Sequence, residues 1–288
     1  MKVINKILLI ILLTNSCYGQ ITTSLGDKVS TLNRIQSIKK STCKVLVDKV
    51  KSGTGFFISS DGLFVTNWHV IFNQITRIDS VGKILSSFSV VNSMNDTLVA
   101  KIVLNLSDES AIQEASFWDY CILKIDGQDR INFLKLGSFS DAYEGAPVYT
   151  CGYPLDLNEP FITVGLISSF FKQSIKVKSK DLNREVAWLD LTTNKGNSGG
   201  PLVLIGEKPE DDRVICLTSF ITTPNFNILE NLNQYVQEME KRGGVKLMGI
   251  DFLQYVKLIN ETANSNSVGI SGCISIEKVS SLTKGYNK

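Results

Sequence analysis

The stretch GNSGGP at residues 196–201 is the most informative part of the chain. Glycines around a serine permit a tight turn in which two backbone N–H groups point at one spot. Here those groups belong to Gly196 and Ser198, and they can hold the oxyanion of a tetrahedral intermediate while the Ser198 hydroxyl attacks. Taken alone, the pattern also fits a plain hairpin loop, so its meaning depends on the segments that accompany it.

A histidine and an aspartate upstream are those companions. His69, the only histidine, lies in VTNWHV at residues 65–70. Histidine is the usual general base near neutral pH, although a lone histidine beside apolar residues is more often structural. Asp119 opens the apolar run DYCILKI; it could be a solvated strand end, but a buried carboxylate needs a partner, and an imidazole N–H is suitable. The pattern indicates His69, Asp119 and Ser198 as candidate catalytic residues.

The remaining pattern predicts an all-β protein. From residue 43 onward, short runs rich in Val, Ile, Phe, Thr and Tyr alternate with Gly, Pro, Asn, Asp and Ser. Many short strands at regular spacing favour a barrel or sandwich over a parallel α/β sheet. Helical periodicity appears at 28–39, where Val29, Leu32, Ile35 and Ile38 share one face, and again at 228–242 and 251–263.

Four motifs in order resemble the chymotrypsin-like serine proteases, most closely the HtrA/Deg branch. They are GTGFFI, TNWHV, DYCILKI and GNSGGPL, and the resemblance covers roughly residues 43–262. It implies two packed six-stranded antiparallel β-barrels with a few peripheral helices, and serine endopeptidase activity on polypeptides, unfolded proteins among them. It also implies envelope protein quality control as a role, allows a homo-oligomer such as a trimer, and requires no cofactor or metal.

The resemblance assigns roles residue by residue. Ser198 would be the nucleophile, His69 the general base, and Asp119 the group that orients His69. The oxyanion hole would be formed by Gly196, Asn197 and Ser198. The pocket for the residue before the scissile bond would be walled by Thr192, Thr193, Leu217, Ser219 and Phe220. None of these five is acidic, so a small or aliphatic residue is expected there rather than Lys or Arg.

Two other function classes share part of this pattern. The α/β-hydrolases need the order Ser, acid, His, and the sole histidine here precedes Ser198, which excludes them. A protease-fold binding or chaperone-like protein with little turnover is the serious rival, because family members can hold unfolded chains as well as cut them. Retention of all three triad positions favours the enzyme.

The first residues read as an export signal. Lys2 and Lys6 precede the apolar run ILLIILL at 7–13, and a cut before Gln20 is expected. The expected organisation is a signal peptide at 1–19, a protease domain at 20–262 and a tail at 263–288, without a PDZ domain and with a periplasmic or secreted location. Signal removal leaves a net charge of (30 − 2) − 28 = 0, which argues against binding to nucleic acid or anionic membranes, and no later segment is apolar enough for a membrane anchor.

The cysteines and one basic segment have structural interpretations. Cys121, Cys151 and Cys216 each sit in an apolar run and are predicted to be buried small hydrophobes rather than metal ligands. The segment 171–184 carries four lysines and Arg184. It is predicted to be a solvated hairpin, with a bias toward acidic substrates as the alternative reading.

Overall fold

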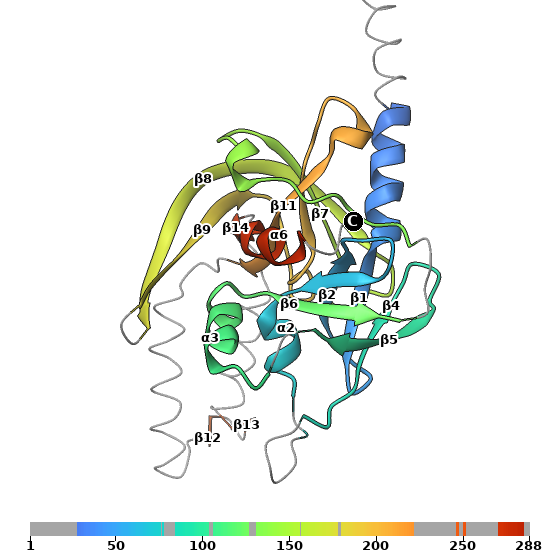
Figure 1. Cartoon of the computed structure of the whole chain (residues 1–288). Helices are drawn as coiled ribbons and strands as arrows, with labels where there is room; N and C mark the ends of the chain where they lie inside the picture. The colour runs from blue at the N-terminus through green and yellow to red at the C-terminus, as the bar shows by residue number, and fades with distance from the viewer. Residues whose placement is uncertain are drawn as a thin grey trace, which may run out of the picture.

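Two closed barrels of antiparallel strands form the body of the protein (Figure 1). The computed structural model describes residues 28–75, 77, 84–103, 106–126, 131–155, 157–177, 180–221, 246–247, 250–251 and 270–284. Within these residues, each barrel has six strands. The predicted all-β fold of two six-stranded antiparallel barrels is therefore confirmed.

The first barrel is built from the N-terminal half of the chain. Its strand order is β1 (Thr42–Val47), β2 (Val50–Phe57), β3 (Leu63–Thr66), β6 (Cys121–Ile125), β5 (Thr97–Ile102) and β4 (Phe88–Val91), with β4 closing on β1. Its interior is filled by alternate residues of these strands, Val45, Phe64 and Leu123 among them. The period of two in the sequence puts these side chains on the inner face.

The second barrel follows from residue 147 onward. Its order is β10 (Pro201–Leu204), β11 (Arg213–Ile221), β14 (Ile270–Ser275), β9 (Lys180–Asp190), β8 (Phe161–Val177) and β7 (Pro147–Gly152), with β7 closing on β10. Strands β8 and β9 form one long hairpin that sweeps away from the barrel in Figure 1. This is the hairpin predicted at 171–184. Cys216 and Cys273 lie in the barrel interior, and every cysteine in the described part of the chain is buried and unbridged.

A third apolar cluster joins the two barrels. It includes Phe56 and Ile122 from the first barrel, and Cys151, Val203 and Leu217 from the second. All five have 9% or less of their surface exposed. The candidate catalytic residues come from loops on both sides of this cluster, so barrel packing determines how they meet.

Short helices lie around the barrels: α2 (Trp68–Phe72), α3 (Glu109–Phe117), α6 (Glu277–Thr283) and the 3₁₀ turns η1 (Phe139–Asp141) and η2 (Pro209–Asp211). A two-stranded pair is formed by β12 (Lys246–Leu247) and β13 (Ile250–Asp251). No helix in the described part of the chain is long and apolar enough to cross a membrane. The predicted signal peptide and the helix at 228–242 lie outside the described residues, as does 251–263 apart from Asp251, which is in β13.

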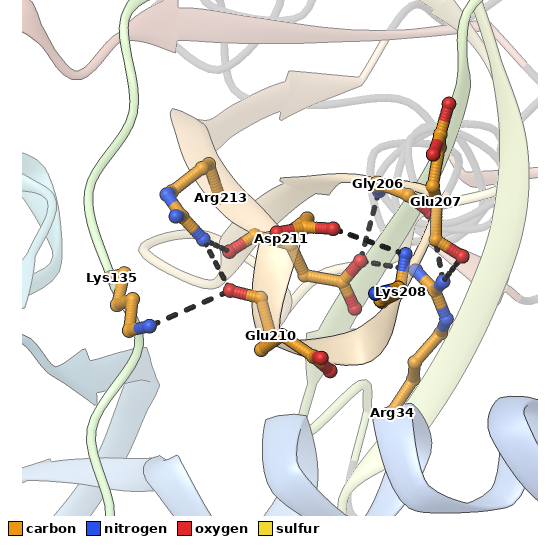
Figure 2. A network of polar contacts seen from close by, with 9 residues as sticks. Arg34, Lys135, Gly206, Glu207, Lys208, Glu210, Asp211 and Arg213 are labelled. Carbon is orange, nitrogen blue, oxygen red and sulfur yellow. Dashed lines mark hydrogen bonds and ion pairs between the residues drawn. The ribbon is translucent and has the colours of Figure 1, made fainter.

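The predicted helix at 28–39 is observed over residues 28–41, but it buries only the C-terminal part of the expected face. Val29 and Leu32 are 58% and 48% exposed, whereas Arg34 and Ile38 are buried. Arg34 can be buried because its guanidinium binds three acceptors. It binds the Asp212 carboxylate and donates to the carbonyl oxygens of Gly206 at 2.8 Å and Glu207 at 3.0 Å (Figure 2). This polar network fixes the helix to the β10–β11 connection, and Ile38 packs into the cluster between the barrels.

The predicted tail at 263–288 is wrong as a boundary. Strand β14 lies inside that range and pairs with both β9 and β11, and α6 follows it directly. A closed barrel leaves no free edge between β9 and β11, so this strand belongs to the second barrel. Its sequence, ISGCIS, is short and half polar, so the sequence pattern does not predict a strand there.

Candidate active site

His69 lies one turn beyond the end of β3, in the short helix α2. Its Nδ1 lies 3.0 Å from Oδ1 and 2.9 Å from Oδ2 of Asp119, and its backbone N–H donates to the same Oδ1 at 3.0 Å. The His69 side chain is 35% exposed and that of Asp119 is 11% exposed. One edge of the imidazole is therefore held by a buried carboxylate while the ring remains accessible.

Asp119 is placed by the way α3 ends. Trp118 is the C-cap, and Asp119 follows with φ of +48°. The N–H of Asp119 donates to Ser116 O at 3.2 Å, and the N–H of Tyr120 donates to Ala115 O at 3.1 Å. These two bonds and the left-handed residue make a Schellman motif, in which glycine is the usual residue. An aspartate accepts this conformation more readily than most side chains, and the turn directs its carboxylate toward His69.

Two further side chains hold Asp119. The Ser219 hydroxyl donates to Asp119 Oδ2 at 2.6 Å, and the Asn67 amide donates to the Asp119 backbone oxygen at 2.8 Å. The sequence predicts Ser219 as a wall of the substrate pocket, but it does not predict the contact of Ser219 with the Asp119 carboxylate. Nothing in a serine on a β-strand signals such a partner, because the contact spans 100 residues of sequence.

The loop that carries Ser198 requires glycine at two positions. Gly196 has φ of +102° and Gly199 has φ of +85°. A Cβ on Gly196 would lie 2.3 Å from the backbone oxygen of Tyr153, and one on Gly199 would lie 2.1 Å from that of Thr54. Left-handed backbone and the lack of space both exclude a side chain, which explains the glycines in the GNSGGP stretch.

The carbonyl groups of this loop are bound by Thr54 of the first barrel and by the segment that follows β7. Thr54 Oγ1 donates to Gly196 O at 2.6 Å, and Thr54 N–H donates to Ser198 O at 2.9 Å. Leu155 N–H donates to Lys195 O at 2.7 Å. Among the described residues, no acceptor is recorded for the N–H groups of Gly196 and Ser198. These two amides can bind an incoming oxyanion.

The Ser198 hydroxyl donates to Ser219 O at 3.3 Å, and no hydrogen bond joins it to His69 among the described residues. Hydrogen bonds in unliganded active sites are often long and tighten when substrate binds. Asn197 is 4% exposed, and its Oδ1 packs against Gly152 without a hydrogen-bond partner in the described part of the chain. The Asn197 side chain is thus packed against β7 and is not exposed to solvent.

The predicted pocket residues have different surroundings. Thr192 is exposed, while Thr193 is buried and its hydroxyl lies 2.6 Å from that of Ser271, which donates to Leu191 O at 2.9 Å. Leu217 is 1% exposed and belongs to the cluster between the barrels. Its predicted role in the pocket wall is therefore wrong. The side chain of Phe220 lies outside the described part of the structure.

Known proteins share this sequence and fold. The chain is 26% identical over 253 residues to serine protease HTRA4 of Homo sapiens, covering 82% of this chain and 48% of that protein. It is 29% identical over 202 residues to a probable periplasmic serine endoprotease DegP-like of Rickettsia conorii, covering 68% and 35%. The chain therefore spans less than half the length of these two relatives.

Structural comparison agrees on the fold. A solved structure of an HtrA-type protease, AlgW with a decapeptide, superposes with a TM-score of 0.55 at 14% identity, covering 88% of this chain and 66% of that one. The family model of the trypsin-like peptidase domain matches residues 53–207, more than half of the chain. The chain belongs to the family of trypsin-like peptidases, as its four motifs predict.

Proposed function

We propose that the protein is a serine endopeptidase in which Ser198 attacks the scissile carbonyl and forms an acyl-enzyme. His69 takes the Ser198 proton at Nε2 and passes it to the leaving amine, and Asp119 stabilises the imidazolium that forms. Water then enters, activated by the same His69, and releases the acyl group. The family match and the geometry around His69 support this assignment.

The observation that carries the proposal is the contact of His69 Nδ1 with both oxygens of Asp119, at 3.0 and 2.9 Å. A carboxylate only accepts hydrogen bonds, so it favours the tautomer with the proton on Nδ1. Nε2 is then the acceptor that a general base needs. The bonds from Ser219 and Asn67 to Asp119 keep the carboxylate in this orientation.

The oxyanion hole in this proposal is made by the N–H groups of Gly196 and Ser198. Donors that are already oriented stabilise the charge that develops in the transition state, and losing one costs on the order of 10²–10³ in kcat. Asn197 completes the turn by its buried position rather than by donating its own amide, because its N–H already donates to Asn194 O at 3.0 Å.

The substrates we propose are polypeptides, unfolded chains among them, with a small or aliphatic residue before the scissile bond. Thr192 and Thr193 are uncharged, and the Thr193 hydroxyl is hydrogen-bonded to Ser271. Neither threonine therefore offers a charged group that would bind a Lys or Arg side chain of the substrate. We further propose export and a role in envelope protein quality control. The periplasmic designation of the Rickettsia relative supports this location.

Fluorophosphonate labelling of the chain without residues 1–19, followed by mass mapping, tests the proposed function. An adduct on Ser198 that is absent from Ser198→Ala and His69→Ala establishes a working nucleophile. Asp119→Asn should lower the labelling rate by a factor on the order of 10⁴, because it favours the wrong His69 tautomer.

The alternative function is a protease-fold binding protein that holds unfolded chains with little turnover. The bond from the Ser198 hydroxyl to Ser219 O, instead of His69, is the observation that favours it. Labelling should therefore be repeated with an unfolded protein present. A folded protein that stays unlabelled in both conditions supports binding, whereas labelling that appears only with the unfolded chain supports an enzyme activated by its substrate.

A further inference from the structure

The long β8–β9 hairpin of the second barrel reaches α3 of the first barrel. Strand β9 packs against α3, and Figure 1 shows the two side by side. On β9, Arg184 faces α3, and Gln173 on β8 is its cross-strand partner. Arg184 is half-buried, whereas Lys172, the other cationic residue of this hairpin whose side chain the structure describes, is exposed.

Three contacts fix the Arg184 guanidinium. Its Nη1 donates to the backbone oxygen of Phe117, and its Cζ lies over the Phe117 ring, 5.1 Å from the centroid. Its Nε donates to Gln173 Oε1 at 2.8 Å. Burial lowers the pKa of Arg184, while the negative charge of Asp119 opposes that shift.

The contact between Arg184 and the Phe117 carbonyl lies at the C-terminal end of α3. Phe117 is the last residue of α3, and the Schellman motif satisfies only the carbonyls of Ala115 and Ser116. The Phe117 carbonyl is one of the helix-terminal acceptors that need a partner from outside the helix. Arg184 supplies that partner, and a cation at the C-terminal end also interacts favourably with the helix dipole.

We propose that Arg184 is a positioning residue for Asp119: by binding the Phe117 carbonyl it holds the turn that directs the Asp119 carboxylate onto His69. This inference rests on the proposed function of the same site. Asp119 occupies a left-handed conformation that side chains other than glycine adopt only where their surroundings hold it, and it follows Phe117 by two residues. Relaxation of this turn to extended backbone would move the carboxylate away from Nδ1, and Arg184 opposes that relaxation from the other barrel.

The sole histidine makes the test specific. In protein labelled with ¹⁵N-histidine, the Nδ1 proton of His69 gives a single low-field NMR signal that reports the bond to Asp119. In Arg184→Met this signal should broaden or vanish, and fluorophosphonate labelling of Ser198 should slow by a factor on the order of 10–10², as a misplaced catalytic group does. Arg184→Lys, which keeps a donor for the Phe117 carbonyl, should recover part of both.

The matched control is Lys172→Met, which removes the same charge from an exposed position on the same hairpin. It should leave the signal and the labelling rate within twofold of the unmodified protein. If Arg184→Met does not fold, Gln173→Leu decides, because it removes only the hydrogen bond that orients the guanidinium at an exposed residue. An intermediate loss of signal in this variant supports the proposal.

A wild-type His69 signal in folded Arg184→Met, or in Gln173→Leu where the first variant fails to fold, overturns the positioning role. The two readouts also separate this proposal from the proposed function. If the unmodified protein shows the low-field signal but Ser198 is never labelled, the endopeptidase assignment fails. The role of Arg184 in the His69–Asp119 bond is then still decided by the NMR comparison.

Discussion

Substitution of Gly196 by alanine is the sharpest test of the oxyanion hole. The added Cβ would lie 2.3 Å from Tyr153 O and 3.3 Å from Leu155 N. Real Cβ atoms do not approach closer than 3.0 Å, so the gap must open by about 0.7 Å. The obstacle is backbone and cannot rotate away, so the peptide that presents the Gly196 N–H must itself move.

A second glycine provides the matched control. Gly145 also has positive φ, +84°, but a Cβ on it would meet nothing within 4 Å. Both substitutions force alanine into left-handed backbone at a cost of roughly 1–2 kcal/mol. Only Gly196→Ala displaces a donor, so only it should lose the transition-state stabilisation of one hydrogen bond, a factor on the order of 10²–10³ in rate.

The assay is the second-order rate of Ser198 modification by a small fluorophosphonate, beside the free energy of unfolding in urea. The expected result is destabilisation in both variants, larger in Gly196→Ala because of its backbone clash, with slow modification in Gly196→Ala and an unchanged rate in Gly145→Ala. Folded Gly196→Ala that reacts within threefold of the unmodified protein would refute the assignment of the Gly196 amide to the oxyanion hole.

Three further predictions concern stability. Arg34→Met leaves Asp212 buried without its partner and should lower the free energy of unfolding by about 3 kcal/mol, with Arg34→Met/Asp212→Asn recovering part of that loss in urea titrations. Thr54→Val should cost about 2 kcal/mol by stranding buried partners of its hydroxyl and should also slow Ser198 labelling; an unchanged rate would mean that the Thr54 bond does not hold the loop. Burial raises the pKa of the Cys121 and Cys151 thiols to about 12, so they stay neutral in the folded state and ionise first in the unfolded one. Stability should thus be insensitive to these thiols below pH about 9 and fall by ~1.4 kcal/mol per pH unit per thiol between there and about 12. Replacement of both by alanine should make that slope shallower by their share, while other buried groups such as Cys43 and Tyr153 still contribute to it.

The fold was accessible from the sequence because local signals agree with it. Short runs of β-branched and aromatic residues between turn residues predict the strands, and the period of two predicts which side chains fill the barrels. The four motifs then order these strands into two barrels. Strand β14 is not predicted from the sequence, because Gly272 and the serines of ISGCIS interrupt any apolar run. Closure of the barrel, rather than local preference, sets the place of this strand.

The site was accessible only in part. His69 and Asp119 could be paired from chemistry alone, since a buried carboxylate needs a donor. The residues that hold them could not, because Ser219 and Arg184 act through contacts across 67 to 100 residues of chain. The prediction that Leu217 lines the substrate pocket is wrong for a related reason. Adjacent residues on a strand face opposite sides, and the sequence did not show which side of β11 faces the cluster between the barrels.

Each barrel donates hydrogen bonds that position a candidate catalytic residue of the other barrel. Thr54, on β2 of the first barrel, fixes the loop of Ser198 in the second. Ser219, on β11 of the second barrel, fixes the Asp119 carboxylate in the first. Because these bonds cross the junction in both directions, displacement of either barrel disturbs the nucleophile and the base–acid pair together. Peptide-bond hydrolysis and packing of the cluster between the barrels should therefore be lost in a single transition, and neither barrel alone would retain a working site.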